Sequence, residues 1–244
     1  MSEGCQLILV KHPNKKNSME ILMSSVVAIN QRARSTEQKM LRRRAVLEAA
    51  EMYFFEVGYE AFSMSKLAKN AGLAKGTLYL YFQTREELFL TLYEQSLIRW
   101  SQVFIDDLSD SMTSKAYAQK LFSTASADGT FLPLLVRLEH MIEHNVAIPR
   151  LISSKQMFIN QVEILAEATS ISLSLSEAQA TEVVKTMGVL LIGASQGDQA
   201  PSLDHEELPE DVQNLIVSFS SEPLFIKNAV RIIEGIRAEA ISNM

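Results

Sequence analysis

The sequence predicts an all-α protein in which a small three-helix head precedes a larger helical domain. Apolar residues recur three and four positions apart along most of the 244-residue chain, with little strand-like alternation. Gly72 separates two short segments of this pattern, and a helix, glycine turn and helix are typical of a helix-turn-helix that reads DNA. We therefore expect a poorly ordered N-terminal extension over residues 1–35, a helix-turn-helix domain over 36–85 and a helical domain over 86–244.

The first helix of the head is expected from Leu41 to Phe55, because apolar residues repeat there at helical spacing and Gly58 follows. The segment His12–Ser18 is polar and has the composition of a loop, which is why we expect little order before residue 36. Three consecutive arginines, Arg42 to Arg44, fit an arm that follows the DNA backbone or enters a minor groove. A solvated basic run is an open alternative for these arginines.

The second helix is expected to begin at Ser63, whose hydroxyl can accept a hydrogen bond from a free backbone N–H of the first turn. Gly72 ends this helix because glycine adopts the left-handed conformation that a tight turn needs. The third helix then runs from Lys75 to Phe82, with Leu78 and Phe82 on its inner face. The outward-facing residues are Lys75, Thr77, Tyr79 and Tyr81. Their side chains supply donors for phosphates and base edges, so this is the predicted recognition helix. An open alternative for Tyr81 is that its ring packs beneath the helix and does not contact DNA.

A long helix is expected after Thr84, since a hydroxyl three residues before Glu87 has the spacing of a capping box. Further helical segments follow, separated by breaks rich in Pro, Ser or Gly, and the longest loop runs from Gly197 to Pro209. The segments are expected at about 85–108, 114–125, 130–145, 148–169, 176–195, 208–219 and 222–242.

A dense, gap-free series of short motifs runs through the head. It comprises Ala49-Ala50, Phe54, Gly58-Tyr59, Phe62-Ser63-Met64, Leu67-Ala68, Ala71-Gly72-Leu73, Lys75-Gly76-Thr77-Leu78-Tyr79, Tyr81-Phe82 and Glu86-Glu87-Leu88. This series resembles the tetracycline-repressor (TetR) family of bacterial regulators. The resemblance implies phosphate contacts by Ser63 and Tyr79, and it implies that Gly76 lets the backbone approach the duplex closely. With the basic and aromatic residues around them, the expected DNA-binding residues are Arg44, Ser63, Lys75, Gly76, Thr77, Tyr79, Tyr81 and Arg85.

Two positions depart from the pattern of this family. Ala74 stands where the family often has Ser or Thr, so a side-chain helix cap is expected to be missing there. Arg85 stands where the family often has Lys, and it keeps the positive charge.

The resemblance also implies that residues 86–244 bind a small molecule and form a homodimer. The middle helices would enclose a pocket for an apolar, weakly charged effector, although plain core packing is an open alternative for the same residues. The pocket candidates are Trp100, Phe104, Phe131, Leu135, Met141, His144 and Phe158. The last two long helices would pair with those of a second copy, with interface candidates Val184, Met187, Leu191, Ala194, Phe225, Ala229, Ile232 and Ile236.

A dimer would place two recognition helices about one DNA turn apart, roughly 34–36 Å, on a palindromic operator. Most members of the resembled family repress transcription, so we expect a ligand-responsive repressor. A ligand-independent activator or a chromosome-organising protein of the same fold is the main alternative.

Charge divides the chain in the same way as the helical pattern does. Residues 1–90 carry 13 Lys and Arg against 9 Asp and Glu, whereas residues 91–244 carry 10 against 20. A basic head neutralises phosphates, and an acidic body is repelled by them, so the charge distribution favours DNA binding through the head.

Other classes of protein find less support in the sequence. The single cysteine, Cys5, excludes an intrachain disulfide framework, and no apolar run approaches the length of a membrane span, so we expect a cytoplasmic protein with no membrane association. His140, Glu143 and His144 match the spacing of inverted zinc peptidases, which keeps a zinc-dependent hydrolase as a remote alternative. The sequence shows no Gly-rich phosphate loop, nucleophile elbow or paired catalytic carboxylates elsewhere, so we expect a non-enzyme without cofactor or metal.

Overall fold

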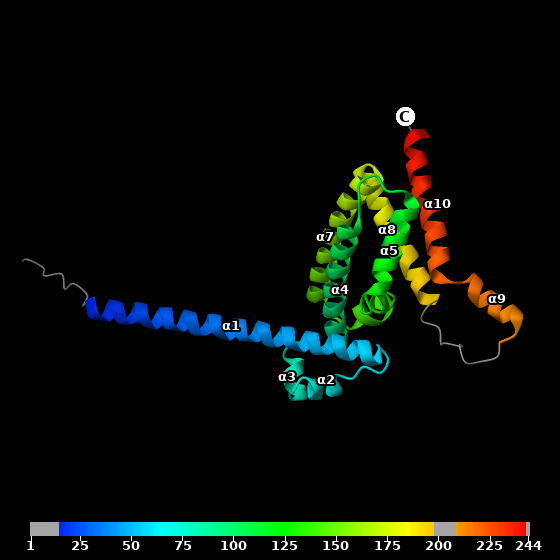
Figure 1. Ribbon diagram of the computed structural model, residues 1–244. Coiled ribbons are helices and arrows are strands. Elements are labelled where there is room, and N and C mark those ends of the chain that lie inside the picture. Colours follow the sequence, from blue (N-terminus) through cyan, green and yellow to red (C-terminus); the bar gives the residue numbers. More distant parts are fainter. Residues whose placement is uncertain (1–14, 198–207, 243–244) are drawn as a thin grey trace, which may run out of the picture. The chain divides into compact units, whose positions relative to one another are not determined.

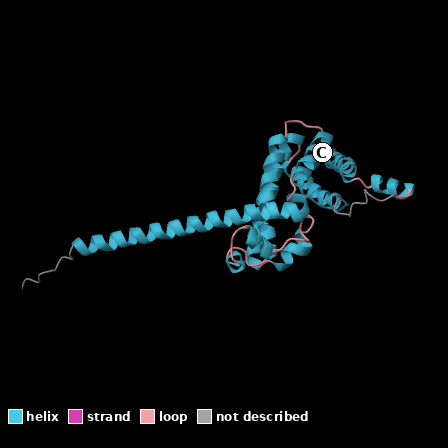
Figure 2. Cartoon of the chain, turned by 60° about the horizontal axis from the view of Figure 1, so that its bottom comes forward, coloured by secondary structure: helices cyan, strands magenta, loops and turns pink. Residues whose placement is uncertain are grey.

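The computed structural model describes residues 15–197 and 208–242, and within them every regular element is a helix (Figures 1 and 2). The chain divides into two units, residues 1–46 and 47–244, which we describe separately. Part of the expected extension, residues 1–14, and most of the expected loop between Gly197 and Pro209 lie outside the described residues.

The first unit consists of the N-terminal part of α1, which runs from Lys15 to Val57 and continues into the second unit. This helix begins well before the expected start at Leu41. The sequence has no proline or glycine between residues 15 and 57, so nothing in the backbone interrupts the helix. It ends at Gly58, which has a φ of +68° and whose N–H donates to the Phe54 carbonyl at 2.8 Å.

The head of the second unit comprises the end of α1, α2 (Met64–Asn70), α3 (Lys75–Tyr79) and the start of α4 (Arg85–Asp107). Phe89 of α4 lies at its centre, with its ring centroid 5.6 Å from that of Phe54, 4.7 Å from Tyr59 and 4.8 Å from Phe62. Such aromatic pairs add to the free energy gained by burial. Because Phe89 is fully buried among head residues, the first turns of α4 belong to the head core.

The body continues from α4 through α5 (Ser114–Ala127), α6 (Phe131–Leu135), α7 (Ile148–Leu173), α8 (Glu177–Gly197), α9 (Glu210–Ser218) and α10 (Ser221–Ser242). α4 packs on α5 and α7, α7 packs on α8, and α10 packs on α5 and α8 (Figure 1). Most helices begin and end within a few residues of their expected limits. Among the described helices, none is both long and apolar enough to span a bilayer.

The expected helix 130–145 is broken into three pieces. After α6 come a π-helical turn, Leu138–Ile142, and a 3-10 turn, Glu143–Asn145. Arg137 Nη1 donates to the Pro133 carbonyl at 2.9 Å, where a regular helix would have the Arg137 backbone N–H as donor. The backbone N–H of Arg137 donates to the Leu134 carbonyl. The wider turn then closes from the Ile142 N–H to the Arg137 carbonyl.

Candidate DNA-binding surface and ligand cavity

The turn between α2 and α3 is built as the glycine predicts. Gly72 has a φ of +65°, the Gly72 N–H donates to the Lys69 carbonyl at 3.1 Å, and the Leu73 N–H donates to the Ala68 carbonyl at 2.8 Å. This pair of bonds is the Schellman motif, which satisfies two carbonyls at the end of α2 and turns the chain into α3.

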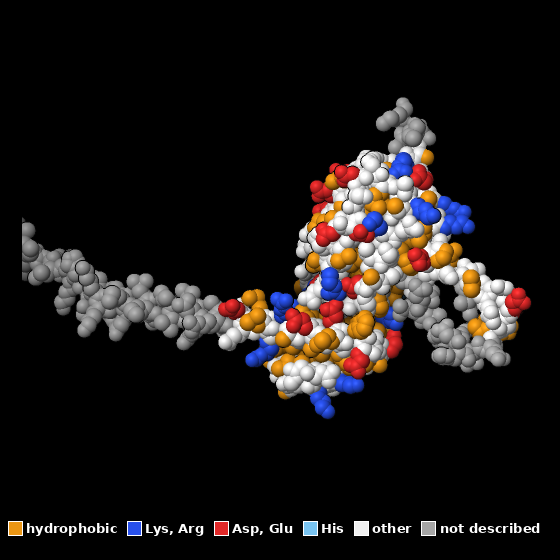
Figure 3. Space-filling model, viewed as in Figure 1, with side chains coloured by type: hydrophobic (Ala, Val, Ile, Leu, Met, Phe, Trp, Pro, Cys, Tyr) orange, Lys and Arg blue, Asp and Glu red, His pale blue; other side chains and the backbone are white. Residues whose placement is uncertain are grey.

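α3 presents a mixed surface. Leu78 and Phe82 are fully buried, whereas Lys75 and Gly76 are exposed and Tyr79 is 39% exposed. A Cβ added at Gly76 would meet no atom within 4 Å, so neither conformation nor packing inside the chain requires a glycine there. Figure 3 shows basic side chains, Lys or Arg, projecting from the α2–α3 end of the unit.

Two further residues complete the description of this helix. Ala74 is its N-cap residue and makes no side-chain cap, as the sequence predicts. Leu80 follows α3 and is 77% exposed. The sequence did not predict a surface role for Leu80, because an apolar residue at this place in the helical repeat can be either buried or exposed. An exposed leucine beside Tyr79 offers an apolar contact for a thymine methyl group.

Five of the predicted DNA-binding residues remain to be placed. Ser63 is exposed and stands at the N-cap of α2, but its hydroxyl makes no capping bond, which corrects the expected cap. The Arg85 guanidinium lies 4.8 Å from the centre of the Tyr59 ring, and its Nε is 3.1 Å from Glu86 Oε1, so this cation is already held by the head core. Arg44 lies exposed on α1 in the first unit. Thr77 and Tyr81 are half-buried.

The start of α4 is capped as predicted. Thr84 Oγ1 accepts from the Glu87 N–H at 2.9 Å and donates to the Asn145 carbonyl at 3.1 Å. Glu87 Oε2 in turn accepts from the Gln83 N–H at 2.8 Å. This reciprocal arrangement fixes the position at which the head passes into the body.

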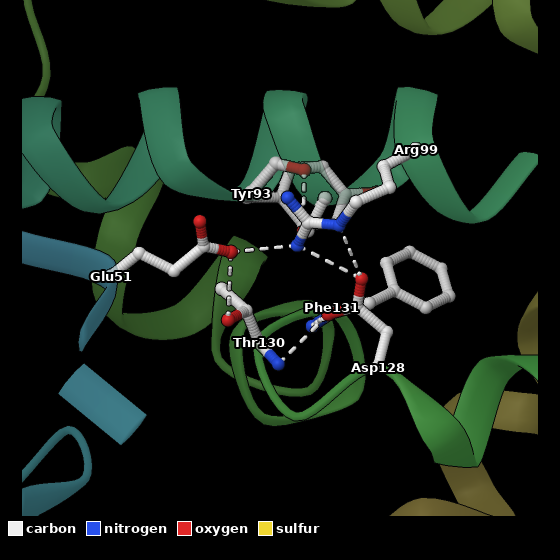
Figure 4. Close-up of polar contacts among 7 residues, drawn as sticks. Glu51, Tyr93, Arg99, Asp128, Thr130 and Phe131 are labelled. Carbon is white, nitrogen blue, oxygen red and sulfur yellow. Dashed lines mark hydrogen bonds and ion pairs between the residues drawn. The ribbon is translucent and has the colours of Figure 1, made fainter. Parts of the chain in front are cut away.

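A polar cluster centred on Arg99 of α4 links the head to the body (Figure 4). Arg99 Nη2 lies 2.6 Å from Glu51 Oε1 of α1, and Arg99 Nε donates to Asp128 Oδ2 at 2.9 Å. Asp128 Oδ1 accepts from the N–H groups of Thr130 and Phe131 at the start of α6, both at 2.9 Å. Burial alone would lower the pKa of Arg99, but the charge of Asp128 and the bonds to Glu51 and Asp128 raise it above its usual value.

The body encloses a cavity of about 590 Å³ lined mainly by apolar residues of α4, α5, α6, α7 and α8. Trp100 stacks on Phe131 at a centroid distance of 4.5 Å and on Phe104 at 5.7 Å, which gives the cavity an aromatic wall. Trp100 Nε1 donates to Thr124 Oγ1 at 3.2 Å, so its polar edge is satisfied. A cavity of this size and composition suits a small apolar ligand.

Five of the seven pocket candidates line this cavity, namely Trp100, Phe104, Phe131, Leu135 and Phe158. Met141 and His144 do not, which corrects their assignment. Both lie in the broken π and 3-10 turns, where the side chains no longer follow one helical face, and both are exposed. Tyr93 and Tyr117 line the cavity without having been expected, although each falls on the buried stripe of its helix.

The interface candidates are mostly internal. Met187, Leu191, Phe225, Ala229 and Ile236 are buried within the chain, with Met187 and Leu191 in the cavity wall and Phe225 beside Phe122 of α5, and Val184, Ala194 and Ile232 are half-buried. The broad apolar stripes therefore serve the intrachain core first. Gly188 and Gly193 on α8 have open space at their Cβ positions.

The possible zinc-binding residues do not come together as a metal site. The turn from π to 3-10 helix between His140 and His144 removes the regular spacing that would place both on one face, and Glu143 Oε1 is 2.6 Å from Lys155 Nζ. Among the described residues, no group of three or more His, Cys, Asp or Glu is arranged to hold a metal ion.

Comparison with known families matches two models along the chain. Residues 46–92 match the bacterial regulatory proteins of the tetR family, and residues 94–240 match the tetracyclin repressor-like C-terminal domain. The chain belongs to the tetR family. This tetR-family protein is therefore a DNA-binding transcriptional regulator rather than an enzyme.

Curated relatives are similar over part of the chain. The fatty acid metabolism regulator protein of Bacillus subtilis is 30% identical over 107 residues, which are 42% of this chain and 55% of that protein. The transcriptional repressor AcnR of Corynebacterium diphtheriae is 30% identical over 73 residues, which are 30% of this chain and 38% of that protein. The tetR-family chain thus spans little more than half the length of the first relative and less of the second.

A solved structure is similar over most of the fold. A TetR variant from Acinetobacter baumannii, in complex with minocycline, superposes with a TM-score of 0.53 and 15% identity, covering 79% of this chain and 94% of that one. At this identity the likeness concerns the fold alone.

Proposed function

We propose that this protein is a ligand-responsive repressor that binds a palindromic operator as a homodimer. The observation that carries the proposal is the double role of α4. Its Phe89 is the centre of the head core, and its Trp100, three turns later, lines the cavity of the body. A ligand that contacts Trp100 therefore contacts the same helix on which the DNA-binding head is built.

Coupling requires that the ligand favour one arrangement of the head over another. Phe131 lies in the cavity wall, and its backbone N–H is held by Asp128, which pairs with Arg99. A ligand that displaces Phe131 would strain this cluster and, through the Glu51–Arg99 pair, the end of α1. Release of DNA would follow from a change in the distance between the two recognition helices of a dimer.

The DNA contacts we propose lie on α3 and the start of α2. Lys75 would pair with a phosphate, Thr77 and Leu80 would meet base edges, and the hydroxyls of Ser63 and Tyr79 would donate to phosphates. Arg85 contributes through the head core that it stabilises. The exposure of Lys75, Tyr79 and Leu80 supports this assignment.

The dimer is proposed to form along α8 and α10. Since Met187, Leu191, Phe225, Ala229 and Ile236 are internal and Val184 and Gly188 line the cavity, contact would fall to the half-buried Ala194 and Ile232 and to the open Gly193. Small residues of this kind allow two helices to approach closely. We also propose the division into a DNA-binding domain over 36–85, to whose core the first turns of α4 contribute through Phe89, and a ligand and dimer domain over 86–244.

The test is fluorescence anisotropy of a labelled duplex from upstream of the gene, with wild-type protein, Lys75→Ala and Lys115→Ala at several salt concentrations. Lys75→Ala should weaken binding and reduce the slope of log K against log salt by about 1, because one phosphate contact is lost. Lys115 is exposed on α5, far along the chain from the head, and serves as the matched control. Equal slopes for all three proteins would contradict the assignment of α3.

Repression and ligand response need their own readout. In vitro transcription from the same promoter should fall as protein is added and recover when a ligand fills the cavity. Increased transcription would instead favour an activator, and equal affinity for random DNA would favour a chromosome-organising protein.

A further inference from the structure

One residue of the cavity wall carries a buried polar atom that the fold leaves without a partner. Tyr93 of α4 lines the cavity and is only 2% exposed, and its hydroxyl has no hydrogen-bond partner among the described residues. A buried hydroxyl without a partner costs free energy, and native proteins rarely keep one without a reason.

A second tyrosine in the same cavity provides the comparison. Tyr117 of α5 is fully buried and also lines the cavity, but its hydroxyl lies 2.7 Å from Thr169 Oγ1. The fold therefore supplies a partner for one of the two phenols and not for the other.

The neighbouring charges explain why Tyr93 finds no acceptor in the chain. The nearby carboxylates are those of Glu94 and Glu143, which raise the pKa of Tyr93 in addition to the larger effect of burial. Both carboxylates are held by cations, Glu94 by Arg150 at 2.7 Å and Glu143 by Lys155 at 2.6 Å. The phenol consequently stays protonated and remains a hydrogen-bond donor.

We propose that the Tyr93 hydroxyl donates a hydrogen bond to an uncharged oxygen acceptor, such as a ketone, amide or ether, on an otherwise apolar effector. This assignment rests on the proposed function of the cavity and names the chemistry of its ligand. The apolar part of such a molecule would lie against the aromatic wall, where Phe131 stacks parallel to Trp100 and to the Tyr93 ring itself. One oriented polar contact within an apolar site is the usual source of ligand specificity.

The charges around the cavity favour an uncharged acceptor over an anionic one. Its lining includes the three carboxylates Glu139, Glu163 and Glu177 but a single cation, Lys185. All four are exposed, so solvent weakens their effect, but their net negative charge and the apolar lining together disfavour carboxylates and phosphates, which would otherwise accept from a phenol.

The experiment uses three compounds of similar shape: benzophenone with a ketone, diphenylmethane without an acceptor and diphenylacetate with a carboxylate. Binding of each to wild-type protein, Tyr93→Phe and Tyr117→Phe is measured by isothermal titration calorimetry, and thermal unfolding of each protein is recorded without ligand. Wild-type protein and Tyr117→Phe should prefer benzophenone over diphenylmethane by about tenfold, and Tyr93→Phe should lose that preference. Diphenylacetate should bind most weakly to all three.

Unfolding supplies a readout that needs no ligand. Tyr117→Phe should lower the unfolding midpoint because it leaves Thr169 without its partner, whereas Tyr93→Phe should leave the midpoint unchanged or raise it. A fall in the midpoint of Tyr93→Phe as large as that of Tyr117→Phe, an undiminished preference for benzophenone in Tyr93→Phe, or tightest binding of diphenylacetate would each overturn the proposal. Binding of benzophenone through Tyr93 without any effect on operator affinity would leave the proposal standing and refute the ligand-responsive repressor.

Discussion

Gly72 and Gly76 stand four residues apart in the head, and the structure gives them opposite requirements. Gly72 has a φ of +65°, a conformation that a side chain makes costly, while Gly76 lies in α3 with open space at its Cβ position. An alanine at Gly72 should therefore destabilise the head, and an alanine at Gly76 should stabilise it. Only contact with DNA would give Gly76 a reason to remain glycine.

Gly76→Ala is expected to raise the free energy of unfolding by about 0.5–1 kcal/mol while weakening operator binding at least tenfold, because the added methyl group faces the duplex. Denaturant unfolding and anisotropy on the same preparations would measure both. Gly72→Ala is the contrast, since it should lose stability and binding together. If Gly76→Ala binds the operator as tightly as wild-type protein, the backbone of α3 does not approach the DNA at this position.

The residues that sequence reasoning placed correctly are those whose role depends on local spacing. Thr84 and Glu87 form the cap that their separation predicts, and Leu78 and Phe82 lie on the buried face of their helical turn. Met141 was expected in the cavity and is exposed, because the helix expected over 130–145 is broken after α6, where the Arg137 side chain bonds to the Pro133 carbonyl. The contact of Arg85 with Tyr59, which lies far from it along the chain, could not be predicted from local spacing either.

Among the helices, α4 depends on its first cap. Thr84→Ala removes the side-chain acceptor of the Glu87 N–H and should lower the free energy of unfolding by about 1 kcal/mol. Thr84→Ser keeps the hydroxyl and should retain most of the stability. Thr113→Ala, at the corresponding cap of α5, provides a second helix start for comparison in the same denaturant titrations. A loss for Thr84→Ser equal to that for Thr84→Ala would show that the methyl group of Thr84, rather than its hydroxyl, stabilises this junction.

The Arg99 cluster connects α1, α4 and the start of α6, so its loss should uncouple the cavity from the head. Because the Arg99 side chain is 45% exposed, Arg99→Ala should cost only about 0.5 kcal/mol of stability. The effect of benzophenone on operator affinity, measured by anisotropy with and without the compound, should nevertheless shrink toward none. Lys120→Ala breaks an exposed pair with Asp107 between α4 and α5 and is the matched control. An unchanged ligand effect in Arg99→Ala would direct the search for the coupling element elsewhere along α4.

The limits of the helices were easier to predict from sequence than the surfaces that they offer. Helix ends follow from glycine, proline and capping residues, which act locally, as Gly58 and Thr84 do. The apolar stripes of α8 and α10 indicate burial without saying by what, and the structure shows that Met187 and Phe225 are buried by their own chain. The sequence placed the start of the first helix at Leu41, whereas α1 begins at Lys15. A polar composition was read as a loop, but a polar segment can form a helix when no proline or glycine interrupts it.

For the whole molecule, the distribution of charge and the proposed dimer belong together. The head is basic and the body acidic, so two heads held side by side would face the same DNA while the bodies are repelled from it. A single short helix such as α3 contacts few base pairs, and pairing two of them on a palindrome is the usual route to specificity.

Gly193 offers the sharpest test of the dimer, because its Cβ position is open within the chain and lies on a helix of the proposed interface. Gly193→Lys should leave the monomer folded, since lysine is a better helix former than glycine, while its bulk and charge oppose close approach of a second copy. Sedimentation velocity should show a dimer for wild-type protein and for Ser126→Lys, an exposed position on α5, and a monomer for Gly193→Lys. The monomer should bind a palindromic duplex no more tightly than a duplex with one half-site, whereas the dimer should prefer the palindrome strongly. A dimeric Gly193→Lys that retains this preference would place the interface on another face of the body, and a monomeric wild-type protein would refute the dimer itself.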